Sequence, residues 1–233
     1  MRTELSLYVD GSRIKSEQYG NIENAEKIIL FCHGFPGSNR ITRLKDSLKN
    51  EPISIVEINY RGDKKSEGKF SFIGSMKDIT TVANYLKDHY GLPLYALGYS
   101  MGGFYVANII NQEPQTFEKA ILLNPVVDTR VLFSNKLVMD ELWMDANNIL
   151  SLKTPEDYEE EIDTVNSTYN PIGFVKRLIT PMTIVQSTAD EVLSPKIAKK
   201  FYASLICEKS YHEIPNAKHD LMGDEEQLIH SII

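Results

Sequence analysis

The sequence predicts an α/β fold with a mostly parallel, doubly wound sheet, an antiparallel N-terminal start and a small helical cap insertion. Three observations support this prediction: short apolar runs rich in β-branched residues, helix-period segments between these runs, and one long segment without a strand pattern. Apolar runs of this kind are typical of strands buried on both faces of a parallel sheet. Strands that alternate with helices along the chain favour a doubly wound layer.

The N-terminal segment predicts a two-stranded antiparallel start to the sheet. Two runs, "LSLYV" and "RIKSEQYG", flank the turn residues Asp10 and Gly11. The five apolar runs that follow are each expected to form one strand. They are "KIILFCHG" (27–34), "ISIVEINY" (53–60), "PLYALGYS" (93–100), "KAILLNPVV" (119–127) and "PMTIVQST" (181–188).

Helix-period segments lie between and after these runs, and each is expected to form a helix. They are "ITRLKDSLKN" (41–50), "SMKDITTVANYLKDHYG" (75–91), "MGGFYVANIINQ" (101–112) and "SPKIAKKFYASLI" (194–206). Asn50, Gly91 and Pro114 stand where three of these helices should end. A last strand is expected around "EKSYHEIP", with a C-terminal helix further along the chain.

The segment from about residue 128 to 170 interrupts the alternation of strands and helices. Its first half, "VLFSNKLVMDELWMDANNIL", has a helical pattern, and an acidic helix should begin at a Thr154–Pro155 cap. A segment of this length is too long to be a simple connecting loop in a compact domain. We therefore expect a single domain over residues 1–233, with this segment as a cap insertion over one edge of the sheet.

The composition disfavours several classes of partner. The 233-residue chain carries a formal net charge of −7, which repels nucleic-acid phosphates and anionic membrane surfaces. No membrane span or signal peptide is expected, since no run of about 18 apolar residues is found. The two cysteines, Cys32 and Cys207, have neither metal-site spacing nor the density of a disulfide framework. These patterns predict a cytoplasmic protein with reduced thiols and no metal.

The pentapeptide "GYSMG" surrounds Ser100 with glycines at an expected junction between a strand and a helix. In that context G-x-S-x-G forms a nucleophile elbow, a sharp turn that exposes the serine hydroxyl. Gly98 and Gly102 would let the strand and the helix approach each other, and Gly103 would let the helix pack closely. The alternative is a glycine-rich turn without chemistry. We favour the elbow and predict that Ser100 is a nucleophile.

A catalytic serine needs a base to remove its proton and an acid to orient that base. Among five histidines, His219 lies in "IPNAKHDLMG", a loop after the last expected strand, from which it can reach the edge of the sheet. It is the predicted base. His89 ends a helix, where a cation favours the helix dipole. His212 lies within a strand pattern, and His230 lies near the chain's last helical segment.

Two aspartates compete for the orienting role. Asp190 follows the strand "PMTIVQ", and Asp128 follows the strand "AILLNPVV". Both would lie at the carboxyl ends of strands, where open α/β sheets build their sites. Asp190 is preferred because it produces the chain order serine, aspartate, histidine that accompanies this motif. Glu191 beside it is interpreted as a solvated loop charge.

Two backbone amides are predicted to stabilise the oxyanion of a tetrahedral intermediate. The Met101 amide lies in the first turn of a helix, where the helix dipole favours negative charge. The Phe35 amide lies in "HGFPGS" (33–38), a loop whose glycines and proline permit unusual torsions. A Cys32–His33 pair is an alternative, but adjacent residues on a strand point to opposite faces. A buried cysteine and a loop-bracing histidine are expected instead.

The chain resembles the α/β-hydrolase superfamily over nearly its whole length. The segments "HGFPGS", "GYSMGG", "STADEV" and "NAKHDL" occur in the family's order and spacing. Their form is most similar to small microbial serine carboxylesterases, of the feruloyl- or cinnamoyl-esterase kind, and to monoacylglycerol-lipase-type hydrolases. The resemblance implies a catalytic triad of Ser100, Asp190 and His219, an oxyanion hole from the Phe35 and Met101 amides, and no cofactor.

The reaction that the resemblance implies is hydrolysis of carboxylic esters of small to medium acyl or aryl groups through an acyl-enzyme. The partner would be a small-molecule ester. A thioesterase or acyltransferase would use the same triad. The acidic run from Glu156 to Asp163 could attract a cationic substrate, as in a serine aminopeptidase, although such a run is usually a solvated face. A non-catalytic binding protein of this fold would usually lack a triad member.

Three aromatic residues are candidates for the substrate pocket. They are Tyr99, which stands where many esterases have histidine, and Phe133 and Trp143 of the cap insertion. The apolar residues of the insertion follow helical spacing, so most of them are expected to make core contacts rather than to line a pocket. This set comprises Leu132, Phe133, Leu137, Met139, Leu142, Trp143 and Met144.

Overall fold

A computed structural model of the protein describes residues 2–37 and 51–221. The helix expected at 41–50 and the C-terminal helix that includes His230 lie outside the described residues. Ser38, the last residue of the "HGFPGS" segment, does so too. The fold and the site below are therefore built from the two described ranges.

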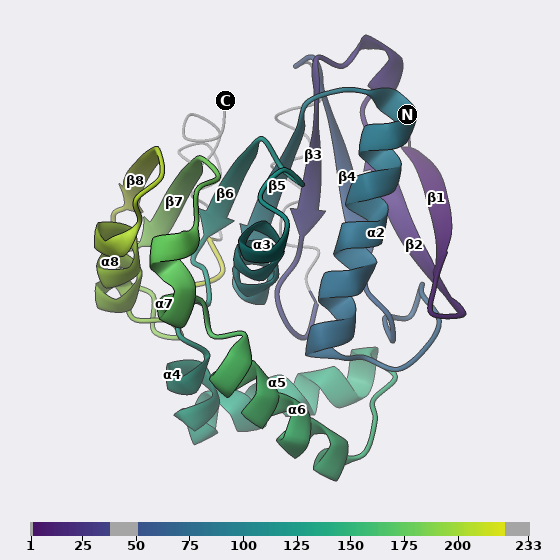
Figure 1. The fold of residues 1–233 in the computed structure, drawn as a ribbon. Helices are drawn as coiled ribbons and strands as arrows, with labels where there is room; N and C mark the ends of the chain where they lie inside the picture. Colours follow the sequence, from purple (N-terminus) through teal and green to yellow (C-terminus); the bar gives the residue numbers. More distant parts are fainter. Residues whose placement is uncertain (1, 38–50, 222–233) are drawn as a thin grey trace.

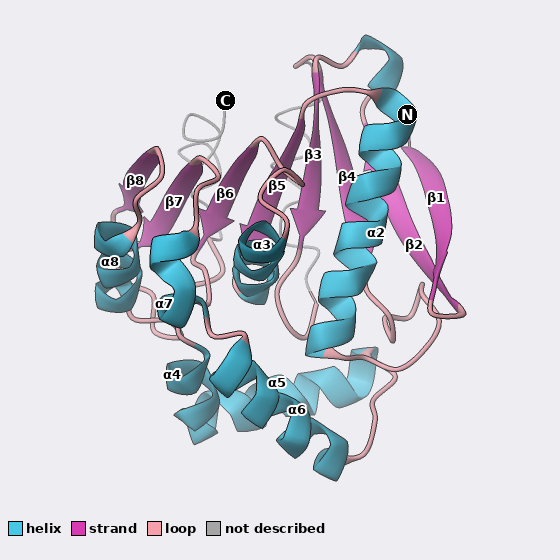
Figure 2. Ribbon diagram, viewed as in Figure 1, coloured by secondary structure: helices cyan, strands magenta, loops and turns pink. Residues whose placement is uncertain are grey.

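Eight described strands form one mixed sheet, which Figures 1 and 2 show from the same side. The order is β1-β2-β4-β3-β5-β6-β7-β8, antiparallel where β2 meets β1 and β4 and parallel elsewhere. The strands are β1 (Arg2–Val9), β2 (Ser12–Tyr19), β3 (Lys27–Cys32), β4 (Ile53–Asn59), β5 (Leu94–Tyr99), β6 (Lys119–Leu123), β7 (Met182–Ser187) and β8 (Lys209–Ile214). The mostly parallel sheet with an antiparallel start is confirmed.

The described helices follow the predicted alternation with strands. They are η1 (Ile22–Asn24), α2 (Phe72–Tyr90), α3 (Met101–Gln112), α4 (Thr129–Ser134), α5 (Lys136–Ile149), α6 (Pro155–Thr168), α7 (Pro171–Phe174), η2 (Val175–Arg177) and α8 (Pro195–Ser204). Helix α2 begins before the expected residue 75, because the Ser71 hydroxyl accepts a hydrogen bond from the Gly74 amide at 2.9 Å and caps the helix. None of the helices in the described ranges is long and apolar enough to cross a membrane.

Residues along one strand alternate between two hydrophobic cores, one on each face of the sheet. In β3, Ile28 and Leu30 belong to the core that α2 and α3 cover. Ile29 and Phe31 belong to the core on the opposite face. All four side chains are almost fully buried. Burial on both faces explains why the parallel strands appear in the sequence as continuous apolar runs.

Helices α4, α5 and α6 lie beyond the carboxyl ends of the parallel strands, below the arrowheads in Figure 1, and are called the cap helices below. The helical stretch 131–150 is divided at Asn135, whose side chain accepts a hydrogen bond from the Val138 amide and starts α5. Helix α6 begins with a capping box between Thr154 and Asp157. The cap helices thus cover the end of the sheet where α/β folds carry their sites.

Candidate active site

Ser100 lies on a sharp turn between β5 and α3. Its backbone has φ 53° and ψ −117°, a sparsely populated conformation that the surrounding structure must enforce. A β-carbon on Gly98 would lie 2.7 Å from the carbonyl oxygen of Gly102. A β-carbon on Gly102 would lie 1.9 Å from the carbonyl oxygen of Cys32. Glycine is therefore required at both positions, because the turn is packed against its own helix and against the end of β3.

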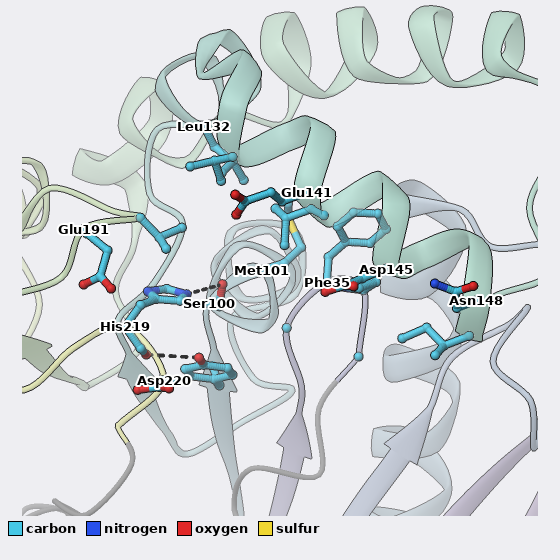
Figure 3. A pocket seen from close by; sticks show the side chains of 18 residues that line it. Phe35, Ser100, Met101, Leu132, Glu141, Asp145, Asn148, Glu191, His219 and Asp220 are labelled. Atoms are coloured by element: carbon cyan, nitrogen blue, oxygen red, sulfur yellow. Dashed lines mark hydrogen bonds between the residues drawn. The ribbon is translucent and has the colours of Figure 1, made fainter.

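Ser100, His219 and Asp190 form a continuous chain of hydrogen bonds. His219 Nε2 lies 3.0 Å from Ser100 Oγ, as Figure 3 shows, and His219 Nδ1 lies 2.8 Å from Asp190 Oδ2. A carboxylate accepts hydrogen bonds, so Nδ1 carries the imidazole proton and Nε2 accepts from the serine hydroxyl. In this arrangement the imidazole is placed to remove the proton of the Ser100 hydroxyl.

The Asp190 carboxylate is held by the loop between β7 and α8. Its Oδ1 atom accepts hydrogen bonds from the amides of Val192 and Leu193, at 2.9 and 2.8 Å. Its Oδ2 atom accepts from His219 and, at 3.2 Å, from the side-chain amide of Gln186. These donors fix the direction of the carboxylate, so it can orient the imidazole.

Asp128, the alternative acid, has different partners. It forms an ion pair with Arg130 at 3.1 Å and accepts a hydrogen bond from the side-chain amide of Asn170 at 2.8 Å. Glu191 is exposed and lies 3.7 Å from the ammonium group of Lys218. The structure thus brings Asp190, rather than Asp128 or Glu191, into contact with the imidazole of His219.

Phe35 and Met101 line the same cavity as Ser100. The loop after β3 packs tightly on the serine turn, since a β-carbon on Gly34 would lie 3.0 Å from Ser100 Cβ. Met101 is the first residue of α3, where backbone N–H groups have no partner within the helix. The two amides predicted to form the oxyanion hole, of Phe35 and Met101, therefore come from a loop and a helix that are in contact beside Ser100.

Cys32 and His33 lie behind this site. Cys32 is fully buried at the end of β3, and burial raises the pKa of its thiol. The His33 ring hydrogen-bonds through Nδ1 to the carbonyl oxygen of Gly34 at 2.8 Å and lies 4.2 Å from the ring of Tyr60. Burial lowers the pKa of His33. These contacts fit a buried thiol and a histidine that braces the loop.

A cavity of about 440 Å³ lies beside Ser100. Figure 3 shows the side chains that line it. They come from Tyr99, the loop 34–37, the His219 loop, the loop after β7 and the cap helices α4 and α5. Helix α5 contributes one face, with residues Val138, Glu141, Leu142, Asp145, Asn148 and Ile149. Sequence reasoning missed the polar members of this face, although their spacing of three or four residues places them on one side of a helix.

Phe133 and Trp143 do not line this cavity. The Phe133 ring packs 5.5 Å from the Phe72 ring, and the Trp143 ring lies 4.8 Å from Tyr158. The Trp143 ring also lies 5.0 Å from the Phe35 ring. Both side chains are partly buried and pack against the core, Phe133 from α4 and Trp143 from α5.

Of the described histidines, His89 and His212 lie outside the site. His89 lies in the last turn of α2 and stacks on Tyr85, with ring centroids 5.1 Å apart. His212 is exposed on β8. Within the described ranges, no group of three or more histidine, cysteine or acidic side chains is arranged to hold a metal ion. His219 is thus the described histidine that contacts the serine.

Two family models match this chain. A model described as "Serine aminopeptidase, S33" matches residues 23–172, which is more than half of the 233 residues. A second, described as "PhoPQ-activated pathogenicity-related protein", matches residues 152–233. The first match spans the serine turn and all three cap helices.

Relatives and solved structures agree with the first match. A monoglyceride lipase homolog of monkeypox virus is 21% identical and aligns with 100% of this chain and 96% of its own length. The acylamino-acid-releasing enzyme of Rattus norvegicus is 23% identical over 76% of this chain but only 26% of its own length. Among solved structures, Est1E from Butyrivibrio proteoclasticus with bound ferulic acid has TM-score 0.78, 18% identity and coverage of 97% and 95% of the two chains.

The monoacylglycerol lipase of Paleococcus ferrophilus has TM-score 0.72 and 16% identity, with coverage of 94% of this chain and 96% of that one. At such identities these structures establish the fold. Together with the family match over residues 23–172, they show that this chain belongs to the serine aminopeptidase S33 family within the α/β-hydrolase superfamily.

Proposed function

We propose that this protein is a serine hydrolase that cleaves carboxylic esters through an acyl-enzyme intermediate. One observation carries the proposal: the unbroken chain of hydrogen bonds from Ser100 through His219 to Asp190, at 3.0 and 2.8 Å. A serine on a strained turn, a base within hydrogen-bond distance and a buried acid behind that base are the components of nucleophilic acyl transfer.

In the first half of the reaction, Ser100 Oγ attacks the carbonyl carbon of the ester while His219 Nε2 takes the hydroxyl proton. The amides of Phe35 and Met101 donate to the oxyanion that forms. His219 then gives its proton to the departing alcohol, and an acyl group remains on Ser100. In the second half, water gives a proton to His219 and attacks the acyl carbon. His219 then returns this proton to Ser100 Oγ as the bond from Oγ to the acyl carbon breaks, and the acid leaves. Asp190 stabilises the imidazolium in both halves.

Esters of small to medium acyl or aryl groups are the proposed substrates. The relative aligned over the full chain is described as a monoglyceride lipase homolog, and the Est1E structure holds ferulic acid. Apolar walls from Leu132, Val138, Leu142 and Ile149 suit such groups in a cavity of about 440 Å³. We further propose that residues 1–233 form one domain with the segment at about 128–170 as its cap.

The test is the substitution Ser100→Ala, assayed on a series of p-nitrophenyl esters that differ in acyl length and aromaticity. We expect kcat to fall by roughly 10⁴-fold or more, because the nucleophile is lost while the fold is kept. Ser167→Ala, an exposed serine on α6, is the matched control and should retain full activity. A fluorophosphonate probe should label the unmodified protein on Ser100 and leave the Ser100→Ala variant unlabelled. Equal turnover by the two proteins would contradict the proposal.

A second candidate function, hydrolysis of aminoacyl amides, is favoured by the charges around the cavity. Four carboxylates line it, from Glu141, Asp145, Glu191 and Asp220, and none of the described lining residues is lysine or arginine. This lining would attract a substrate with a free amine. Including an aminoacyl arylamide and its N-acetylated form beside the esters separates the two functions: an aminopeptidase would turn over the arylamide with a free amine and not the acetylated one, whereas an esterase would turn over neither.

A further inference from the structure

The backbone carbonyl of His219 accepts two side-chain hydrogen bonds. The Tyr99 hydroxyl donates to it at 3.0 Å, a contact drawn in Figure 3, and the Asn124 side-chain amide donates to it at 2.9 Å. A carbonyl oxygen has two lone pairs, and in His219 each of them accepts one of these hydrogen bonds. The two donors come from the ends of neighbouring strands, since Tyr99 ends β5 and Asn124 follows β6. The His219 backbone is therefore tied to the sheet at two points.

The backbone conformation and the hydrogen bonds of Asn124 hold its side chain in position for this contact. It is fully buried and has a left-handed φ of 41°, which ends β6 and which asparagine tolerates better than most residues. Its Oδ1 atom accepts from the amide of Ser187 at 2.7 Å, and its Nδ2 atom also donates to Ser187 Oγ at 2.9 Å. These bonds to the end of β7 fix the direction in which the amide donates to His219.

Two further hydrogen bonds hold the His219 loop at residues that precede the histidine in the chain. The Asn216 amide donates to the Thr188 hydroxyl at 2.8 Å, and the Ala189 amide donates to the Ala217 carbonyl at 3.0 Å. Asp190 holds the imidazole ring but not the backbone that carries it. The imidazole bonds to Asp190 and Ser100 through its two nitrogens, but it is still displaced if its backbone moves. A displacement of about 1 Å can lower turnover by about 10²-fold.

We propose that Asn124 and Tyr99 are positioning residues for the base, and that they act by holding the carbonyl of His219. This inference rests on the proposed function. Both donors bind the carbonyl of His219, and the Tyr99 ring also lies 5.5 Å from the His219 ring. Their hydrogen bonds set how far the imidazole lies from Ser100, so their loss lowers the rate of proton transfer. Asn124 is not among the residues that line the cavity, and Tyr99→Phe keeps the ring that lines it, so substrate binding is unchanged.

Two substitutions test the proposal. Aspartate at position 124 has the shape of asparagine, tolerates a left-handed φ and keeps the oxygen that accepts from the Ser187 amide. At pH 8, however, Asn124→Asp replaces the amide group that donates to the His219 carbonyl with a carboxylate oxygen. We expect kcat to fall by about 10²-fold, with KM within about twofold of the unmodified value. Tyr99→Phe removes one hydroxyl and keeps the ring, and should lower kcat by roughly three- to tenfold.

Tyr158→Phe is the matched control. Tyr158 and Tyr99 are each 5% exposed, and the Tyr158 hydroxyl donates to the carbonyl of Phe70 at 2.9 Å, far from the histidine loop. It should lose stability as Tyr99→Phe does but keep kcat. A downfield proton NMR resonance from His219 Nδ1–H gives a readout independent of activity. It should shift or broaden in Asn124→Asp and Tyr99→Phe, and stay in place in Tyr158→Phe.

The possible failures are distinguishable. If the unmodified protein turns over esters and Ser100→Ala does not, but Tyr99→Phe and Asn124→Asp both keep kcat within twofold and the NMR resonance is unchanged, the positioning role is wrong and the proposed function stands. A rise in KM at constant kcat would likewise overturn it. Should Asn124→Asp fail to fold, Tyr99→Phe against Tyr158→Phe still decides the matter. If Ser100→Ala retains activity, the proposed function itself fails.

Discussion

Asp190 and Asp128 follow neighbouring strands, yet their surroundings give their carboxylates different chemistry. The side chain of Asp190 is fully buried, and its strongest partners are backbone amides and His219. Asp128 is partly buried, which by itself raises its pKa, but hydrogen bonds from Arg130 and Asn170 outweigh burial and lower this pKa. Asp128 is thus an ion-pair partner in the cap region, and Asp190 is the acid available to an imidazole.

Substitution of each aspartate by asparagine separates their roles. We expect Asp190→Asn to lower kcat by about 10⁴-fold, because an amide in place of the carboxylate favours the wrong imidazole tautomer and cannot stabilise the imidazolium. Asp128→Asn removes only a half-exposed ion pair and should change kcat by less than about threefold. Steady-state kinetics on one p-nitrophenyl ester provides the comparison. A large loss in Asp128→Asn with little change in Asp190→Asn would reverse the assignment.

At the scale of elements, one buried carboxylate joins a cap helix to the core. Glu161 of α6 accepts hydrogen bonds from the Ser71 hydroxyl at 2.5 Å and from the Ile73 amide at 2.9 Å, both at the start of α2. It also pairs with Lys153 at 3.2 Å. A carboxylate at a helix N-terminus interacts favourably with the helix dipole. This contact fixes α6 on α2, and thereby fixes the position of the cap helices above Ser100.

Removing this carboxylate should destabilise the protein. We expect Glu161→Ala to lower the free energy of unfolding by about 3 kcal/mol, because buried donors at the start of α2 and the Lys153 ammonium lose their partner. Glu160→Ala, an exposed neighbour on the same helix, is the control and should change it by less than about 0.5 kcal/mol. Urea unfolding measures both. Equal effects would mean that the link between α6 and α2 contributes nothing to stability.

At the scale of the whole molecule, burial of His33 couples folding to pH. Burial lowers its pKa, and this effect exceeds the opposing effect of its hydrogen bond to the Gly34 carbonyl. In the unfolded chain its pKa is about 6.5. Below that pH the unfolded state binds a proton that the folded state does not, so the contribution of His33 to stability is fully present above about pH 6.5 and is lost as the pH falls.

His33→Gln should therefore weaken the pH dependence of stability. Between pH 7.5 and 5.0, the free energy of unfolding of the unmodified protein should fall more steeply than that of the variant, by up to about 1.4 kcal/mol per pH unit. Urea unfolding at several pH values gives both slopes. His212→Gln, at an exposed position, should leave the slope unchanged. If His33→Gln also leaves it unchanged, folding does not shift the pKa of His33.

Local patterns in the sequence are enough to predict the fold class. Apolar runs of β-branched residues predict the parallel strands because both faces of each strand are buried, and the glycines around Ser100 predict the turn because only glycine fits where β-carbons would collide. The hydrogen-bonded set of Ser100, Asp190 and His219 follows from the same signals, since each residue comes just after a strand. These features depend on neighbours in the chain, or on rules shared by all parallel sheets.

Other features depend on how distant elements pack, and the tertiary structure decided them. Phe133 of α4 and Trp143 of α5 pack against the core, while Glu141 and Asp145 of α5 line the cavity. The rotation of α5 is set by contacts of Trp143 with Phe72 of α2 and Tyr158 of α6. The contact of Asn124 with the His219 carbonyl joins residues that lie 95 positions apart. No local pattern encodes such a contact, because side-chain direction is fixed only when all the elements around it are in place.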